Sequence, residues 1–286
     1  MLNHPSRRQF IIAWAVSLVH LGGTLPTAAA LPSVYAKRVL DKKPCGYWRL
    51  GEKAGPVIAD ASGGGHDGTA QGQIVFSQKG MLDREADSAL GFDGTSGCVE
   101  IPSHASFSQP TSGVGFTVEA WMPPDVLEFA GGEGEDGYVH WLGKGETGKM
   151  EWAFRFYPKT SARPNRVSAY IFNSGPGLGS GAYVEEDIKP GKWMHIVAVF
   201  DPGDATNPKA GVSLYKDGKL ALSPATSPGA LYKAYNVMPV AGDSPLRLGT
   251  RDKKSFFTGA LDEVAIYPRA LAAREIADNY RAGRAG

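Results

Sequence analysis

Short apolar segments alternate with clusters of glycine, proline, asparagine and aspartate along most of the chain, and no long segment of helical periodicity precedes residue 269. This pattern predicts an all-β protein, a sandwich with a short C-terminal helix. The expected strands occupy residues 46–50, 89–92, 98–101, 116–122, 139–144, 151–157, 166–173, 193–201, 211–216, 246–250 and 260–267.

Three segments predict a central strand, a hairpin and a C-terminal helix. Residues 192–201 are apolar on both alternating faces, which indicates a central strand covered on both sides. Asp217-Gly218 separates two apolar segments and predicts a tight hairpin, because both turn positions tolerate a positive φ. Pro268 ends the last strand, and residues 269–282 predict a short amphipathic helix lying on the sheet.

Composition and charge narrow the class of function. Of 286 residues, 42% are hydrophobic and 21% are charged, which is enough apolar material for a packed core. The 30 basic and 29 acidic side chains leave a formal net charge of +1, so no overall field favours nucleic acid or an anionic membrane. No apolar run reaches the roughly 18 residues of a membrane span.

The N-terminus has the layout of an export signal. Arg7-Arg8 is followed by an apolar stretch over residues 10–21 and by small residues at 27–30. The arginine pair resembles a bacterial twin-arginine signal, and the alternative is a short buried or amphipathic helix. We expect cleavage after residue 30, a linker over 31–44, a single domain over 45–286, and a periplasmic or secreted protein with no membrane span.

Cys45 and Cys98 are the two cysteines of the chain. An even number of cysteines in an oxidising compartment predicts one disulfide between them, closing a long loop. The alternative is two buried free thiols.

Seven motifs occur in the order found in laminin G-like domains. They are residues 47–52, 60–68, 90–94, 116–121, 193–198, 214–219 and 259–267, followed by Arg269-Ala270-Leu271. The chain therefore resembles a laminin G-like domain of the concanavalin A-like lectin/glucanase superfamily over nearly all of residues 45–286. The resemblance implies a concanavalin A-like jelly-roll sandwich of two antiparallel sheets, an architecture that serves lectins, adhesion modules and enzymes alike.

A glycine-rich loop over residues 60–68 holds acidic side chains that can converge with main-chain carbonyls on one hard cation. The resemblance implies a structural calcium, with Asp60, Gly65, His66 and Asp262 as contributors. The alternative is that Asp60 only stabilises turns, while Asp262 holds a strand end.

Alternating residues on two expected strands predict a sugar-binding platform. Arg155 and Tyr157 share the outward face of one strand, and Arg166 and Tyr170 share that of the next. Aromatic rings and arginines suit the apolar faces and the hydroxyls of a pyranose. The alternative is an ordinary solvated sheet face.

The motifs of jelly-roll enzymes are incomplete in this chain. No strand reads Glu-x-Asp-x-x-Glu, the pattern that resemblance to jelly-roll glucanases would require. Tyr232 and Tyr235 resemble one strand of alginate-lyase-like jelly rolls, without its partner motifs. His195 lies on the central strand and is interpreted as structural.

The sequence thus predicts an exported, calcium-stabilised module that binds a glycan or polysaccharide without cleaving it. A polysaccharide lyase or glycoside hydrolase on the same fold, or an adhesion module with a protein partner, are the alternatives. Nucleic acid is not an expected partner.

Overall fold

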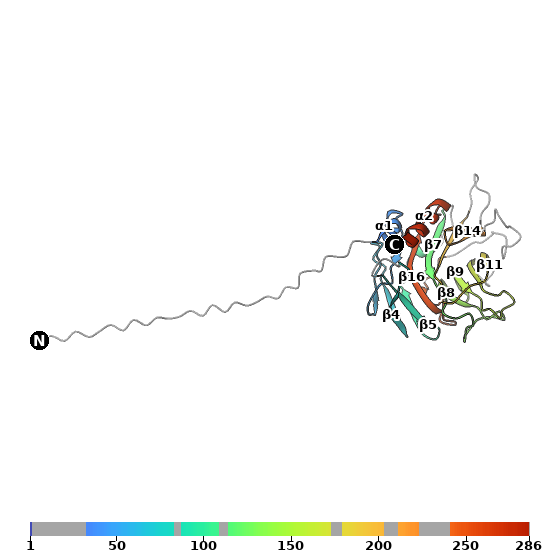
Figure 1. Cartoon of the computed structure of the whole chain (residues 1–286), viewed down its shortest axis with the longest axis horizontal. Helices are drawn as coiled ribbons and strands as arrows, with labels where there is room; N and C mark the ends of the chain where they lie inside the picture. The colour runs from blue at the N-terminus through green and yellow to red at the C-terminus, as the bar shows by residue number, and fades with distance from the viewer. Residues whose placement is uncertain are drawn as a thin grey trace. The chain divides into compact units, whose positions relative to one another are not determined.

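Two antiparallel sheets of eight strands each form the sandwich, which confirms the predicted fold class (Figure 1). Apart from Met1, the computed structural model describes residues 33–82, 87–108, 114–172, 179–202, 211–222 and 241–285. The predicted export signal and the residues Tyr232 and Tyr235 lie outside this described part.

The first sheet, named sheet A, has the strand order β14-β13-β12-β7-β16-β5-β4, with β1 paired to β16. Its strands are β1 (Gly46–Trp48), β4 (Ile74–Lys79), β5 (Ser88–Asp93), β7 (Phe116–Met122), β12 (Met194–Asp201), β13 (Gly211–Lys216), β14 (Lys219–Leu222) and β16 (Thr258–Tyr267). The predicted central strand is β12, and it lies between β7 and β13.

The second sheet, sheet B, has the order β11-β10-β9-β8-β15-β6-β3-β2. Its strands are β2 (Val57–Ile58), β3 (Gly68–Gln71), β6 (Cys98–Ile101), β8 (Val139–Glu146), β9 (Lys149–Phe156), β10 (Arg166–Phe172), β11 (Gly179–Glu185) and β15 (Leu246–Leu248). The sequence analysis missed β2, β3, β4 and β11, which are short, glycine-containing or mixed in polarity.

The main core lies between the two sheets. Alternation along β9 sends Trp152, Phe154 and Phe156 into it, where Trp152 packs 5.9 Å from the Phe116 ring of β7. All of these side chains are fully buried, and each such burial contributes about 1.5–3 kcal/mol. The alternation predicted for this strand is confirmed, and it leaves Arg155 on the opposite face.

Two helices cover the outer face of sheet A and make a second core there. Helix α1 (Val34–Asp41) buries Tyr35 and Val39, and α2 (Ala273–Ala285) buries Ile276, against side chains of β7, β12 and β16. Figure 1 shows the two helices side by side over this sheet. Residues 34–41 are therefore not a linker, because their apolar face is needed to close the second core.

None of the described helices is long and apolar enough to cross a membrane.

The hairpin predicted at Asp217-Gly218 joins β13 to β14. Asp217 has a φ of 51° and Gly218 a φ of 73°, as a tight two-residue turn of this hand requires. The Gly218 Cα also lies against Tyr280 of α2, where an added Cβ would come within 2.8 Å of the Tyr280 Cβ.

The predicted disulfide is not formed. Cys45 and Cys98 are free thiols, and Cys45 Sγ donates to the Ser106 carbonyl oxygen at 3.3 Å. Cys45 leads into β1 of sheet A whereas Cys98 begins β6 of sheet B, so the two cysteines belong to different layers of the sandwich.

A buried carboxylate on β7 connects the helices to sheet A. Glu119 is fully buried and accepts hydrogen bonds from Tyr35 of α1 at 2.9 Å, His195 of β12 at 2.7 Å and Tyr267 of β16 at 2.8 Å. Asn279 of α2 donates to both of its oxygens, at 3.1 and 2.8 Å. One carboxylate of β7 therefore accepts hydrogen bonds from four other elements, α1, β12, β16 and α2.

Burial alone raises the pKa of Glu119, but the hydrogen bonds from His195, Tyr267 and Asn279 outweigh it and lower the pKa overall. His195 is thus structural in its contacts: its Nε2 donates to the carboxylate, and its side chain is fully buried.

We predict that Glu119→Gln destabilises the protein by roughly 3 kcal/mol, because an amide cannot accept from all four donors and leaves buried polar groups unpaired. Chemical denaturation at neutral pH measures this loss. Glu135→Gln, which changes an exposed acid, is the matched control and should leave the midpoint unchanged.

The same pair of proteins tests the charge of Glu119. Because its pKa is lowered on folding, the stability that it contributes is complete above the unfolded value of about 4.3 and is lost as pH falls through the folded value. The difference between unaltered protein and Glu119→Gln should therefore narrow on acidification. A difference that stays constant with pH contradicts this account.

Candidate functional site

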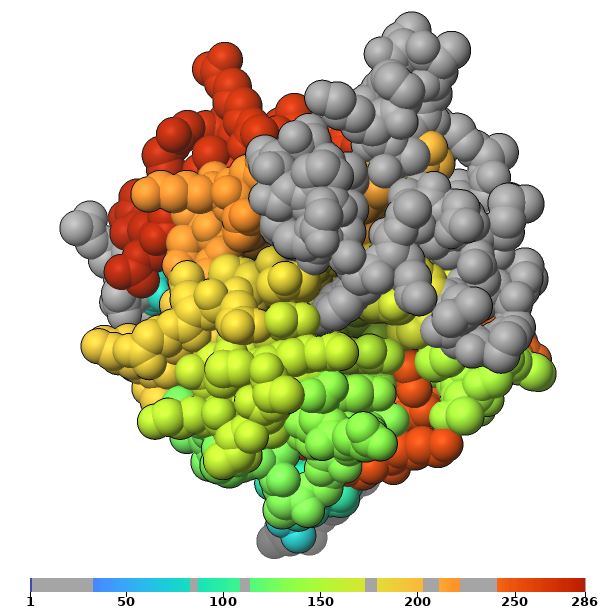
Figure 2. All heavy atoms as spheres, turned by 90° about the vertical axis from the view of Figure 1, so that its right-hand side faces the viewer, coloured from blue at the N-terminus to red at the C-terminus, as the bar shows by residue number. Residues whose placement is uncertain are grey.

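The outer face of sheet B presents a cluster of aromatic and basic side chains from three neighbouring strands. The Arg155 cluster, as we name it, consists of Tyr138, His140, Arg155, Tyr170 and Phe172. Residue pairing across the strands places His140 of β8 opposite Arg155 of β9, and Ser168 of β10 opposite Arg155 on its other side. Figure 2 shows this side of the molecule in green to yellow.

Arg155 is the centre of the cluster. Its guanidinium carbon lies 4.4 Å from the centre of the Tyr138 ring, 5.2 Å from that of Tyr170 and 5.5 Å from that of Phe172. Such distances are typical of cation–π contacts. Within the described residues, its two terminal nitrogens have no hydrogen-bond partner, and the side chain is partly exposed. They remain available to an acceptor from outside.

His140 holds Arg155 in place. Arg155 Nε donates to His140 Nε2 at 3.2 Å, so the ring proton lies on Nδ1, which is 2.8 Å from Glu133 Oε1. Ser255 Oγ donates to the same oxygen at 2.6 Å. Both ring nitrogens of this fully buried histidine are therefore occupied.

Electrostatics agree with this assignment. Burial, together with the charges of Arg251 and Arg155, lowers the pKa of His140 to about 4, although the hydrogen bond to Glu133 opposes the shift. Burial alone raises the pKa of Glu133, but its bonds to His140 and Ser255 lower it to about 2. At neutral pH the pair is an imidazole beside a carboxylate, a rigid support for Arg155.

The structure brings Arg155 and Tyr170 together but separates the other two predicted platform residues from them. Tyr157 is almost completely buried, with its ring 5.3 Å from that of Tyr138. Arg166 lies over the ring of Tyr183 at 3.7 Å and forms an ion pair with Glu185 at 2.7 Å. The platform is therefore centred on Arg155.

In the glycine-rich loop predicted to bind calcium, the carboxylate of Asp60 accepts hydrogen bonds from three backbone amides. Asp60 Oδ1 accepts from the amides of Tyr47 and Ser62, at 3.0 and 2.9 Å, and Oδ2 accepts from His66 at 3.0 Å. Burial raises the pKa of Asp60, and these bonds lower it overall. Asp60, Gly65 and His66 form the turn of the alternative interpretation, and Asp262 belongs to a different cluster.

Asp262 lies with two other acids. One carboxylate oxygen from each of Asp87, Asp262 and Glu263 lies within 4.8 Å of the others. Arg49 donates to Glu263 at 2.8 Å and lies 3.7 Å from Asp87, so one guanidinium pairs with two of the three carboxylates. Tyr47 also donates its hydroxyl to Glu263.

The donor set of this acidic cluster fits a hard cation. Asp262 is fully buried, its Oδ2 accepts from the Met81 amide at 2.8 Å, and its Oδ1 has no hydrogen-bond partner. Burial, followed by the charges of Glu263 and Asp87, raises its pKa well above the usual range. An orphaned oxygen among three carboxylates is what a divalent ion would satisfy.

A second group, Glu133, His140 and Asp252, also brings three ligand atoms within 4.8 Å. Arg251 lies 2.8 Å from Asp252 and 4.0 Å from Glu133. The guanidinium of Arg251 thus supplies the positive charge that a metal ion would bring to this group.

Tyr138, His140 and Glu133 were not predicted. Glu133 and Tyr138 lie between the expected strands 116–122 and 139–144, where no alternation indicates the direction of a side chain, and His140 lies in β8. A bulge between His140 and Leu142 also breaks the alternation that would have placed His140 beside Arg155. Asp87 was missed because it is far from Asp262 in the chain and belongs to no recognised motif.

Solved structures similar to the chain include binding domains of botulinum neurotoxins. The serotype G binding domain is 13% identical, with a TM-score of 0.58, over 83% of this chain and 50% of that chain. The binding domain of neurotoxin DC, in complex with rat synaptotagmin II, is 10% identical, with a TM-score of 0.60, over 86% of this chain and 52% of that one.

A third structure is described as "Cell entry of botulinum neurotoxin type C is dependent upon interaction with two ganglioside molecules", and it is 10% identical, with a TM-score of 0.60, over 86% of this chain and 52% of that one. The chain spans about half the length of these proteins. At such identities the similarity shows the fold alone.

Among curated protein sequences, none matches the chain. The family profile Laminin_G_3, described as the concanavalin A-like lectin/glucanases superfamily, matches residues 93–277, more than half of the 286 residues. The matched segment contains β7, β12, β13 and β16, whose motifs carried the resemblance seen in the sequence. The chain belongs to the laminin G-like family of the concanavalin A-like lectin/glucanases superfamily.

Proposed function

We propose that the chain is an exported, non-catalytic carbohydrate-binding module, and that its glycan binds on the outer face of sheet B at the Arg155 cluster. The observation that carries this proposal is the partly exposed Arg155 guanidinium, which His140 holds among aromatic rings. Neither of its terminal nitrogens has a hydrogen-bond partner in the part of the chain that the structure describes. A planar donor beside rings suits a sugar hydroxyl or carboxylate together with the apolar face of the sugar.

Similar structures support a binding role of this kind. One, of botulinum neurotoxin type C, is described as interacting with two ganglioside molecules, and another was solved with rat synaptotagmin II. The first agrees with a glycan ligand and the second with the alternative of a protein partner.

The arrangement around Arg155 favours binding over cleavage. A general base must reach a substrate proton, and His140 is fully buried with both ring nitrogens engaged. Its pKa, lowered to about 4, describes a neutral support for Arg155. The alternative is a lyase or hydrolase, and the binding experiment tests it by measuring the release of new chain ends.

We predict that Arg155→Ala weakens retention on the recognised polysaccharide by at least about tenfold, because the variant loses charge-assisted hydrogen bonds. Arg155→Lys should lose most of the retention as well, since an ammonium cannot reproduce the planar guanidinium. Affinity electrophoresis against a panel of polysaccharides measures retention, and release of new chain ends is assayed in the same samples.

The matched control is Arg274→Ala, which removes an exposed arginine of α2, a helix over the other sheet. Thermal unfolding establishes that each variant is folded. Equal retention of Arg155→Ala and the unaltered protein contradicts the proposed face, and new chain ends contradict the non-catalytic role. Retention on no polysaccharide shifts the proposal to a protein partner.

We further propose that a structural calcium binds Asp87, Asp262 and Glu263. The orphaned Asp262 oxygen and the excess of carboxylates over guanidinium support this placement. Met81 and Leu82 donate their amides to Asp262 and Asp87, at 2.8 and 3.3 Å, so an ion here would hold the connection between β4 and β5 against β16.

Calcium at a hundredfold excess over its Kd should stabilise the unaltered protein by about 3 kcal/mol, measured as a shift in thermal unfolding against a chelator-treated sample. Asp262→Asn should remove the shift while keeping an acceptor for the Met81 amide. Asp60→Asn is the control, because the loop over residues 60–68 would lose the shift if it held the ion. An unfolding transition unaffected by calcium overturns the metal.

Export is proposed from the N-terminal arginine pair, with the periplasm or the medium as the destination. Arg7→Lys/Arg8→Lys should trap the protein in the cytoplasm of a bacterial host that has a twin-arginine pathway, because the variant keeps the charge but loses the motif. Cell fractionation with immunodetection measures this. Unchanged export of the double variant contradicts a twin-arginine route.

A further inference from the structure

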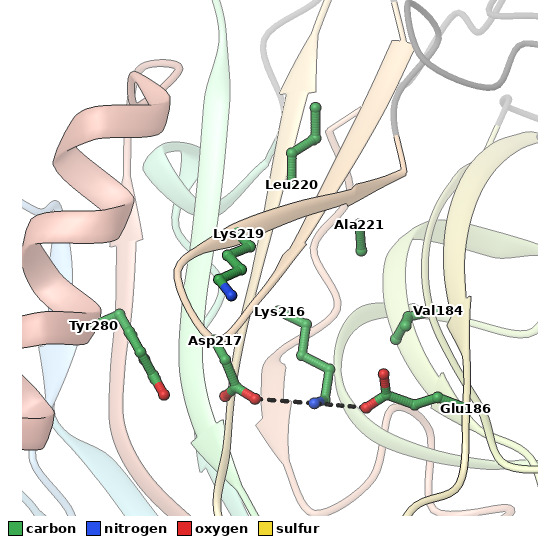
Figure 3. Close-up of a pocket in the computed structure, with 8 residues that line it drawn as sticks. All are labelled: Val184, Glu186, Lys216, Asp217, Lys219, Leu220, Ala221 and Tyr280. Atoms are coloured by element: carbon green, nitrogen blue, oxygen red, sulfur yellow. Dashed lines mark hydrogen bonds and ion pairs between the residues drawn. The ribbon is translucent and has the colours of Figure 1, made fainter.

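A polar groove lies at the margin of the helix-covered sheet, between α2 and the turn that joins β13 to β14. It has two lobes, with volumes of about 480 and 350 Å³, and Asp217 and Tyr280 line both. Figure 2 shows the hairpin (orange) next to the C-terminal helix (red), and Figure 3 shows the first lobe.

One lysine pairs with both acids of the groove. Lys216 forms ion pairs with Glu186 and, at 2.9 Å, with Asp217, whose other oxygen accepts from the His195 amide at 3.0 Å. Burial lowers the pKa of Lys216, but these two partners raise it overall. Figure 3 shows the ammonium between the two carboxylates, so its charge offsets one of their two negative charges.

The remaining cations of the groove have no acid of their own. Lys219 lines the first lobe, and Lys192 and Arg284 line the second. All three are exposed, and no ion pair or hydrogen bond of their side chains occurs within the described residues. The groove therefore carries a net positive charge in a protein that is nearly neutral overall.

Aromatic rings form a rigid wall between the lobes. The Tyr280 ring stacks on Trp121 at 5.7 Å with an interplanar angle of 17°, and lies 6.0 Å from the His195 ring. Trp193 lines the second lobe and is partly exposed. Trp121, which also lines that lobe, is fully buried with an indole N–H that has no acceptor. The wall thus offers the Tyr280 and Trp193 rings, supported from behind by Trp121.

We propose that this groove is a second ligand site and that it binds a carboxylate-bearing saccharide. Tyr280 and Trp193 offer ring surfaces for a pyranose, and Lys192, Lys219 and Arg284 offer charge for its carboxylates. Each lobe has the volume of a small ligand site. The site goes beyond the proposed function, because it lies at sheet A and uses no residue of the Arg155 cluster.

The test is a calorimetric titration of the full chain with oligogalacturonate and oligomannuronate. The same oligosaccharides with methyl-esterified carboxylates are the neutral probes. The unaltered protein should bind at least one acidic probe, and esterification should weaken binding at least tenfold. Lys219→Glu/Arg284→Glu should also weaken it at least tenfold, because both lobes lose a cation and gain an acid.

The control variant is Arg38→Glu/Arg274→Glu, which reverses two exposed helix arginines outside the groove and changes the net charge equally. It should bind within about twofold of the unaltered protein. Tyr280→Phe keeps the stacked ring and removes only its hydroxyl, so it should weaken binding only slightly. A much larger loss in Lys219→Glu/Arg284→Glu is then due to charge.

Four results overturn the proposal. They are no binding of either acidic probe, equal binding of the esterified probes, equal loss in the groove and control variants, and full affinity in the groove variant. Arg155→Ala separates the two sites: if only this variant loses binding, the saccharide lies on sheet B, which supports the proposed function and contradicts the groove.

Discussion

The architecture depends on one buried carboxylate. Glu119 is fully buried on β7 and accepts hydrogen bonds from α1, β12, β16 and α2. A charge in such a place is tolerated only when its partners satisfy it, so the helices cannot leave the sheet without exposing an unpaired group. The network makes the part of sheet A under the two helices an interior surface.

Sheet B also contains a buried polar network, which positions Arg155. The imidazole of His140 lies between the Glu133 carboxylate and the Arg155 guanidinium, so a buried polar chain again fixes one side chain. Here the last member of the chain is partly exposed and keeps two unbonded nitrogens. A donor that is held in position loses little entropy on binding, which is why we place the glycan at Arg155 rather than at Arg166, whose charge is paired with Glu185.

Local pattern was enough to predict the fold class, because alternation in β9 and β12 and the Asp217-Gly218 turn depend on near neighbours. It placed Arg155 outward for the same reason. It failed for α1, whose single apolar stripe has meaning only against the sheet, and for Asp87, which meets Asp262 only through the long path of the chain. Cys45 and Cys98 show the limit most simply, since their separation in the chain carries no information on which sheet each one joins.

One wall of the groove beside Tyr280 is held by the Glu119 network. Its wall is Tyr280 stacked on Trp121, and the His195 ring that lies against both is bonded to Glu119. The residue before Tyr280 in α2 is Asn279, which donates to the same carboxylate. The hydrogen bonds to Glu119 that hold the helices therefore also hold the Tyr280 wall of the groove. The wall is in position before any ligand binds. Two preorganised sites on opposite sheets would let one chain hold two segments of a polymer, and the second contact then forms at a high effective concentration.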